Sequence, residues 1–335
     1  MPREGNRMNT EVINHSFSAR VKKGITTYFK ENLAILVAFI ILCVGLSIAT
    51  PAFFTKDNIL NVLRQVATNS NLAIGLTMAI IIGGIDLSVG AILAFSGLLC
   101  ASFISDGMNL GLAVLLAFTL GALFGLLNGL IIAYTNMPPF VVTLATQNIA
   151  RGIVNVYANG QPISARNPVF NFLGVGYFLG IPLPVIYSFV LLAVMILILG
   201  RSKFGRQLYA VGGNEEAARF SGINIKKVKI IVYTLCGALA SFSGIILAAR
   251  MYSGQPTAGD GFELDAIAAS VLGGVSFSGG VGKLGGTIIG VLVLGVLTNG
   301  LNLLNINSFW QYIIKGIIIL LAVYLDILKK RREKD

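Results

Sequence analysis

The residues of this chain most able to do chemistry are ionisable side chains that interrupt long apolar runs: Arg64, Asp86, Arg151, Asp265, Lys315 and Asp326. Such groups are costly at membrane depth and usually serve an ion or solute pathway. Asp86 is the most informative, because glycines and a serine surround it in GGIDLSVG, residues 83–90, which predicts a broken helix. Its carboxylate could face a pathway or gate, or it could cap a helix that starts near Leu87. Lys315 could extend to the membrane surface or pair inside the bundle.

Neutral polar side chains in the same runs predict where a hydroxylated solute could pass. With Asp86 and Ser88, the candidate pathway residues are Asn69, Asn71, Asn128, Gln147, Asn148 and Asn299. Amide side chains also bridge membrane helices, so each has a purely structural alternative.

No residue pattern in the chain indicates catalysis. GGVGKLGG, residues 279–286, fails as a phosphate-binding loop, because Phe277 stands at the first glycine position and Leu284 follows Lys283. The single histidine, His15, lies in a polar N-terminal stretch, and the three cysteines lie in separate apolar runs. We therefore expect no catalytic residue, no metal site and no cofactor bound by this chain. An intramembrane enzyme would lack a recognisable reactive group.

A charged stretch in the middle of the chain, AVGGNEEAARFSGI at 210–223, predicts a short cytoplasmic helix. Asn214 is a candidate N-cap, the two glutamates fall where the helix dipole favours negative charge, and Gly222 ends the helix. The residues with an expected role are Gly213, Asn214, Glu215, Glu216, Ala217, Ala218, Arg219 and Gly222. A solvated surface helix would need only charge, whereas a short rigid helix between two membrane spans could dock on a cytoplasmic partner and relay its motion.

The composition places these residues in a membrane protein. Of 335 residues, 55% are hydrophobic and only 12% are charged, whereas a soluble domain carries about 25% charged residues. The net charge of +11 comes largely from three basic clusters, within 3–30, 201–229 and 329–334. Because the clusters flank apolar runs, they indicate membrane topology rather than a nucleic-acid-binding face.

Apolar runs of the length that a crossing helix needs predict about ten membrane crossings. The runs are 33–50, 58–82, 86–104, 109–134, 138–157, 183–200, 230–250, 263–281, 284–304 and 307–327. Even numbers of runs separate the basic clusters, so all three can face the cytoplasm. The predicted fold class is an all-α integral membrane protein, a polytopic bundle of about ten transmembrane helices that is broken around Gly83–Asp86.

This topology divides the chain into a cytoplasmic N-terminal tail (1–32), a transmembrane domain (33–327) with a cytoplasmic loop at 201–229, and a cytoplasmic C-terminal tail (328–335). External loops are expected at 51–57, 105–108, 158–182, 251–262 and 305–307. The longest of them should form a compact loop or a short surface helix.

Two glycine patterns have open interpretations. Small residues at helical spacing, such as Gly121, Gly125 and Gly129, predict close helix packing, with hinges as the alternative. IGGIDLSVG at 82–90 and LGGVSFSGG at 272–280 could mark related halves of the fold or arise by chance.

Three stretches carry a resemblance to a known family: GGIDLSVG at 83–90, GRQLYAVGGNEEAARFSGINI at 205–225, and GQPTAGDGFELDAIAASVLGG at 254–274. They resemble the membrane permease subunit of ribose-type ABC sugar importers, and the resemblance spans about 33–327. In that family, the Glu-Ala-Ala loop matched by Glu216, Ala217, Ala218 and Gly222 is the coupling helix that contacts the ATPase subunit.

The resemblance implies a bacterial inner-membrane protein that works as a dimer of permease copies in the lipid membrane, with the pathway at their interface. It implies a cytoplasmic ATPase with two nucleotide-binding modules, which would hold ATP and Mg, and an extracytoplasmic sugar-binding protein. The expected cargo is a monosaccharide, with ribose or a similar pentose first.

Alternatives remain open at this point. A permease of the same architecture could carry galactose, inositol, a furanose signalling molecule, a nucleoside or a branched-chain amino acid. An ion-coupled secondary carrier would need carboxylates at mid-depth, and the only suitable groups are Asp86, Asp265 and Glu263.

Overall fold

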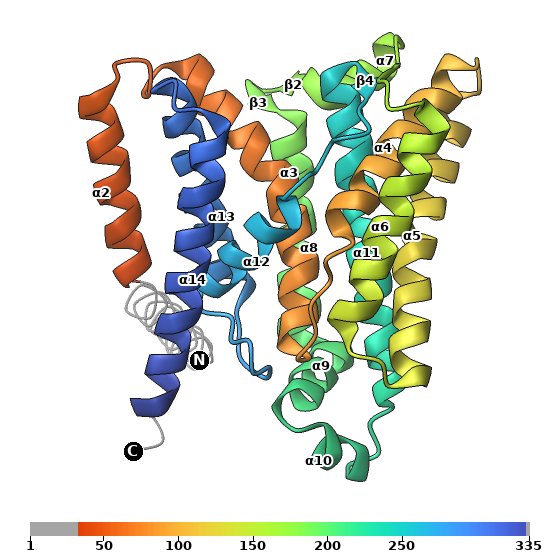
Figure 1. Ribbon diagram of the computed structural model, residues 1–335, viewed down its shortest axis with the longest axis vertical. Coiled ribbons are helices and arrows are strands. Elements are labelled where there is room, and N and C mark those ends of the chain that lie inside the picture. Colours follow the sequence, from red (N-terminus) through yellow and green to blue (C-terminus); the bar gives the residue numbers. More distant parts are fainter. Residues whose placement is uncertain (1–32, 333–335) are drawn as a thin grey trace, which may run out of the picture.

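The computed structural model describes residues 33–332 as a bundle of helices (Figure 1). Its longer helices are α2 (Leu33–Ala49), α3 (Lys56–Ile81), α4 (Val89–Ser105), α5 (Leu110–Thr135), α6 (Pro139–Ala158), α8 (Leu183–Arg201), α11 (Ile225–Met251), α13 (Leu284–Leu303) and α14 (Ser308–Arg332). The shorter elements are β1 (Ile163–Ser164), α7 (Pro168–Val175), β2 (Tyr177–Phe178), β3 (Ile181–Pro182), α9 (Lys203–Gly213), α10 (Glu215–Phe220), β4 (Ser253–Gly254) and α12 (Phe262–Leu272). The expected tail at 1–32 and residues 333–335 lie outside the described part.

The all-α membrane class that the sequence predicts is confirmed. Within residues 33–332, nine of the ten apolar runs form helices of 17 to 27 residues. Four of these helices, α5, α8, α11 and α13, are both long and apolar enough to cross a membrane, and shorter apolar helices accompany them. The number of crossings stays a prediction.

The run at 263–281 was expected to be one crossing helix, and this expectation is wrong. Only Phe262–Leu272 is helical. Gly274 then adopts a φ of 85°, which favours glycine and ends the helix. A turn follows in which Ser276 N donates to the Val281 carbonyl at 3.0 Å.

The domain boundaries stay a prediction, and the structure adds helices at two of the cytoplasmic segments. Helix α14 continues to Arg332, so the expected tail at 328–335 begins as helix. The expected loop at 201–229 contains helices α9 and α10 and the first turn of α11. Lys and Arg are good helix formers, so basic residues that mark topology do not stop a helix.

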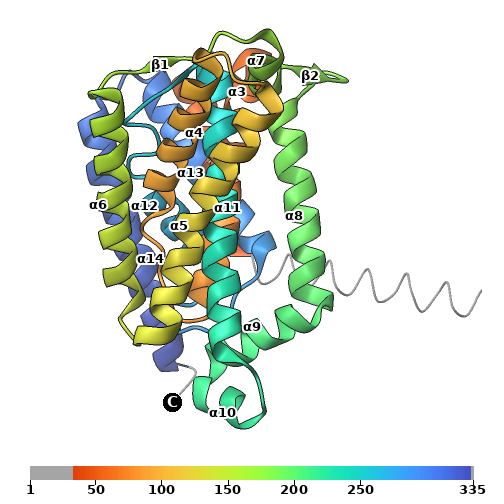
Figure 2. The same ribbon diagram turned by 90° about the vertical axis from the view of Figure 1, so that its right-hand side faces the viewer.

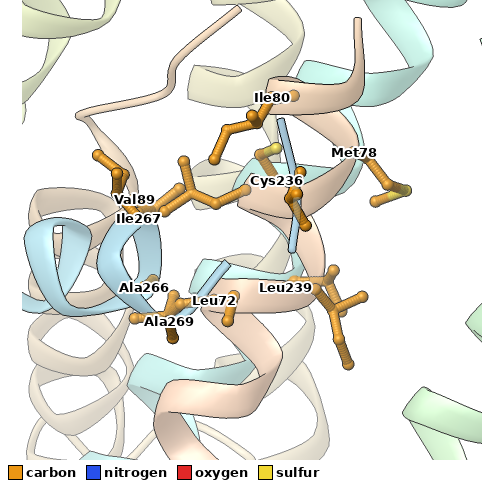
Figure 3. Close-up of a cluster of buried hydrophobic side chains, with 14 of the residues drawn as sticks. Leu72, Met78, Ile80, Val89, Cys236, Leu239, Ala266, Ile267 and Ala269 are labelled. Atoms are coloured by element: carbon orange, nitrogen blue, oxygen red, sulfur yellow. The ribbon is translucent and has the colours of Figure 1, made fainter. Parts of the chain in front are cut away.

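Helix α3 lies at the buried centre although its sequence is among the more polar. Every residue from Val66 to Ile81 is buried. Figure 3 shows side chains of α3 meeting those of α4, α11 and α12 in one cluster that includes Leu72, Met78, Ile80, Val89, Cys236, Leu239, Ala266, Ile267 and Ala269. This confirms a helix that places its polar residues inward and then breaks.

Hydrogen bonds to neighbouring helices satisfy polar groups of α3. Ser243 Oγ of α11 donates to the Thr68 carbonyl at 3.3 Å, and Cys236 Sγ donates to the Gly75 carbonyl at 3.2 Å. The Thr77 hydroxyl pairs with the hydroxyls of Ser270 (3.1 Å) and Thr287 (2.8 Å). These bonds allow a polar helix to lie inside the bundle.

The glycine stripe on α5 packs against α11, which confirms its predicted role in close packing. A Cβ added to Gly237 would lie 2.8 Å from the Cα of Gly125, and one added to Gly129 would lie 2.8 Å from the Cα of Ile230. Only glycine permits such a close approach of the two helix backbones.

The bundle has two distinct ends (Figures 1 and 2). Helix α7 and the short strands lie at one end, where β1 pairs with β4 and β2 with β3, both antiparallel. Helices α9 and α10 and the C-terminal part of α14 lie at the other end. The compact structure expected for 158–182 is confirmed, with α7 as its short helix.

Candidate functional site

The charged stretch forms the predicted short helix, α10, which protrudes from its end of the bundle (Figure 2). Asn214 is the N-cap, and its side-chain oxygen accepts a hydrogen bond from Ala217 N at 2.9 Å. After the C-cap Ser221, Gly222 has a φ of 77°, which favours glycine and ends the helix. The local signals read from the sequence are confirmed here.

The two glutamates of α10 have different surroundings. Glu215 pairs with Lys229 Nζ at 2.9 Å and with Arg219 at 3.7 Å, so it ties α10 to the start of α11. Glu216 is exposed, and its carboxylate has no hydrogen bond or ion pair to any residue within 33–332. Of the two glutamates, Glu216 is therefore the one available to contact another protein.

Phe220, which the sequence reading missed, is the most exposed large hydrophobic side chain among the described residues, at 90%. It is the last residue of α10, whereas Ala218 is buried at 4% and anchors the helix on the bundle. The signal in the sequence that could have identified it is its position directly after EEAAR. An exposed aromatic side chain on a short rigid helix is typical of a residue that inserts into a partner's groove.

Helix α9 connects α10 to the broken helix. A Cβ on Gly212, near the end of α9, would overlap the carbonyl oxygen of Ile81, the last residue of α3. That carbonyl accepts a hydrogen bond from Gly280 N at 2.8 Å, and Tyr209 of α9 donates to the Gly282 carbonyl at 2.8 Å. The end of α3, the end of α9 and the loop after α12 therefore meet at one point, which we call the glycine junction (Ile81, Gly212, Gly280).

The break after α3 is confirmed, and Asp86 lies buried within it. One carboxylate oxygen accepts hydrogen bonds from Ser88 N at 2.9 Å and Ser88 Oγ at 2.5 Å. Helix α4 begins at Val89 with Ser88 as its N-cap, so the helix start expected near Leu87 is two residues too early. The other oxygen of Asp86 has no partner within 33–332.

Three of the candidate pathway residues belong to one buried network. Asn128 Nδ2 donates to Ser88 Oγ at 2.9 Å, next to Asp86, and Asn128 Oδ1 accepts from Thr146 Oγ1 at 2.6 Å. The network joins the break to helices α5 and α6. Thr146 was not among the sequence candidates, because a threonine on an apolar helix gives no distinctive signal.

The other candidate pathway residues lie elsewhere. Gln147 Nε2 donates to Glu263 Oε1 of α12 at 3.1 Å, whereas Asn148 is exposed and donates to the Leu144 carbonyl of its own helix. Asn299 exchanges two amide hydrogen bonds with Asn58, at 2.7 and 3.0 Å. Asn69 and Asn71 are buried in α3, and the side-chain oxygens of both have no partner among the described residues.

The two copies of the glycine pattern have similar local structure. In the first, Ser88 N donates to the Asp86 side chain at 2.9 Å, and at the same position in the second, Ser278 N donates to Ser276 Oγ at 3.2 Å. Both copies follow the end of a buried helix, and the glycine junction brings them together.

Comparison with known proteins shows that this chain is similar to transport permeases. Residues 58–323 match a family described as "Branched-chain amino acid transport system / permease component". The ribose import permease protein RbsC of Bacillus subtilis is 49% identical over 298 residues, which cover 88% of this chain and 92% of the relative. The ribose import permease protein RbsC of Escherichia coli K12 is 47% identical, covering 87% of this chain and 92% of its own.

A more distant relative has a different sugar in its name. The L-arabinose ABC transporter permease protein AraH of Azospirillum brasilense is 35% identical over 316 residues, which cover 94% of this chain and 93% of the relative. No solved structure matches this chain.

Proposed function

This chain belongs to the family of permease components of the branched-chain amino acid transport type, and we propose that it is the membrane-spanning permease subunit of an ATP-driven monosaccharide importer. Ribose or a similar pentose is the first choice of cargo. The observation that carries the proposal is the 49% identity to a ribose import permease over 88% of the chain. The three relatives named for ribose or arabinose are a better guide to cargo than the amino acid in the family's description, because they are 35–49% identical over 87–94% of this chain.

In this proposal, a partner protein and not this chain supplies the energy for transport. Helix α10 would dock in a groove of a cytoplasmic ATPase with two nucleotide-binding modules, with Glu216 and Phe220 facing the partner. The chain would be a transporter subunit and not an enzyme, with ATP and Mg bound by the ATPase. Movement of α10 would reach the broken helix through α9 and the glycine junction.

The rest of the assembly follows from the same proposal. A second copy of the chain would complete the pathway, and an extracytoplasmic sugar-binding protein would deliver the cargo to the end of the bundle that carries α7 and the short strands. The protein would be a multi-pass protein of the bacterial inner membrane, with about ten crossings. Both termini and α10 would face the cytoplasm, as the basic clusters favour.

Reconstitution in proteoliposomes tests this function. We expect uptake of labelled ribose only when the chain, its ATPase, its loaded binding protein and ATP are all present. A secondary carrier would instead accumulate sugar with the chain alone under an ion gradient and would be sensitive to Asp86→Asn. Accumulation by the chain alone would refute the proposal.

The choice of cargo has a separate test. Unlabelled galactose, inositol, a nucleoside and a branched-chain amino acid are each added with the native binding protein as competitors of ribose uptake. We expect none of them to compete as well as ribose itself. A better competitor would replace ribose as the cargo and leave the importer assignment intact.

A further inference from the structure

A cavity of about 180 Å³ lies between α12 and α14, apart from α10 and from the Asp86 network. Its principal polar lining residues are Asp260, Asp265, Ser308, Gln311, Tyr312 and Lys315. Figure 1 shows the two helices side by side, with the start of α14 toward the end of the bundle that carries α7.

An ion pair forms part of the cavity wall. Lys315 Nζ lies 2.8 Å from Asp265 Oδ2, and the two side chains are 23% and 11% exposed. Of the two alternatives for Lys315, pairing inside the bundle is the one observed. Lys315 lies roughly 10 Å along α14 from Ser308, at 1.5 Å per residue. Ionisable groups in membrane proteins face a bundle interior or a water-filled cavity, so a cavity with this pair in its wall suits water or a polar ligand better than lipid.

The charges around the cavity balance. Lys315 neutralises Asp265, and Arg151 of α6 lies 3.5 Å from Asp260 at the cavity's edge. An anion or a cation would leave one of these charges without its partner, which is costly away from bulk water. The site is therefore suited to a neutral, polar ligand.

The lining also offers both kinds of surface that a sugar needs. The Ser308 hydroxyl and the ion pair can exchange hydrogen bonds with sugar hydroxyls. The Gln311 side-chain oxygen can accept one, whereas its nitrogen already donates to Asn302 at 2.7 Å and to the Ile306 carbonyl at 3.3 Å. The ring of Tyr312 is 59% exposed, and its Cε1 would lie 3.8 Å from a Cβ on Gly261. An exposed ring of this kind can cover the C–H face of a sugar. Pockets for drug-sized ligands measure about 300–1,000 Å³, so this smaller cavity suits one monosaccharide.

We propose that the cavity between α12 and α14 is a monosaccharide-binding subsite on the translocation route. Asp265, Lys315 and Gln311 contact the sugar hydroxyls, and Tyr312 covers its apolar face. This inference rests on the proposed function and deepens it, because it places the cargo on particular residues of this chain.

The first test compares two neighbouring aromatic residues of α14. Tyr312 lines the cavity and Trp310 does not, although their exposed fractions are 59% and 60%. In the complete transporter with saturating loaded binding protein, we expect Tyr312→Ala to lower ribose uptake about tenfold and Trp310→Ala to leave it within about twofold. Copurification of each variant with the ATPase shows whether both assemble. Equal uptake by the two variants would overturn the subsite.

The second test measures whether water and sugar reach the cavity. Gly316 lines it, and a Cβ added there has no atom within 4 Å, so Gly316→Cys fits without strain. Ile317→Cys is the matched control, because Ile317 is 54% exposed but does not line the cavity. Cys43, which is only half-buried, is replaced by serine in both variants.

A charged methanethiosulfonate reagent, which cannot dissolve in lipid, is applied to the complete transporter in vesicles. We expect it to modify Gly316→Cys at least about tenfold faster than Ile317→Cys, and loaded binding protein with ATP to slow the reaction at Gly316→Cys only. If the wild-type transporter imports ribose but the two cysteines react alike, only the subsite is refuted. If the wild type imports no monosaccharide, the proposed function fails as well.

Discussion

Reversal of the charge at Glu216 should uncouple this chain from the proposed ATPase subunit without unfolding it. Glu216→Lys replaces a favourable interaction with the N-terminus of α10, worth about 0.3–1 kcal/mol, with an unfavourable one of similar size. The loss of helix stability is thus roughly 1–2 kcal/mol. The Asn214 cap, the Glu215–Lys229 pair at 2.9 Å and the buried Ala218 all remain, so α10 and the bundle should persist.

The effect at the interface should be larger. Like charges placed opposite each other across an interface cost several kcal/mol, so we expect sugar-stimulated ATPase activity and ribose uptake to fall at least about tenfold. Both activities are measured in proteoliposomes that hold the chain, its ATPase and its loaded binding protein. The melting temperature of the solubilised chain should change by only a few degrees.

Two control variants make the result specific. Glu216→Gln removes the charge without reversing it and should have a smaller effect. Ser221→Lys adds the same positive charge at the other end of α10, where the helix dipole favours it. Normal sugar-stimulated ATPase activity in Glu216→Lys would refute the role given to this side chain, and so would a loss of coupling in Ser221→Lys as large as that in Glu216→Lys.

Three further variants test other parts of the structure. Phe220→Ala should leave the melting temperature unchanged, because the side chain is 90% exposed, and should lower the affinity of the chain for its ATPase in a pull-down titration; unchanged affinity would contradict its docking role. Gly212→Ala places a Cβ on the Ile81 carbonyl oxygen and should destabilise the chain by about 1–3 kcal/mol, seen as a lower melting temperature; an unchanged melting temperature would contradict the close approach. Asn299→Leu removes both amide bonds to Asn58 and should lower the melting temperature by an amount equivalent to about 1–2 kcal/mol, with transport retained at low temperature; a lost transport rate at unchanged melting temperature would instead place Asn299 in the pathway.

The sequence was most informative where the signals were local. Helix α10 has its cap at Asn214 and its terminating glycine at Gly222, and both are visible in a single short stretch. The break at 82–88 was equally visible, because two glycines and a carboxylate interrupt a long apolar run. Helix propensity, capping and burial act in the same direction at these positions, so a sequence pattern is sufficient to find them.

Hydropathy gave a wrong prediction where the backbone conformation ends a helix inside an apolar run. Residues 263–281 are apolar enough to read as a crossing, but Gly274 at positive φ and the turn after it end α12 early. Contacts between residues that lie far apart in the sequence also could not be predicted from it. Lys315 and Asp265 are 50 residues apart, and Asn58 and Asn299 are 241 apart. Many partners were possible in sequence for each of these groups, and only the packing of the helices selects one.

The position of α3 has a consequence for how the protein is made. Two of its backbone carbonyls, those of Thr68 and Gly75, accept hydrogen bonds from Ser243 and Cys236 of α11, which lie 175 and 161 residues later in the chain. At the usual rate of protein synthesis, α3 leaves the ribosome on the order of ten to thirty seconds before α11 does. The Thr77 hydroxyl waits longer still, because its partners Ser270 and Thr287 lie on α12 and α13. During that interval the polar side chains of α3 need another environment, at the insertion machinery or at the bilayer surface, because lipid alone offers them no partner. The central helix is synthesised early, and its polar groups reach their final partners only after α11, α12 and α13 have followed.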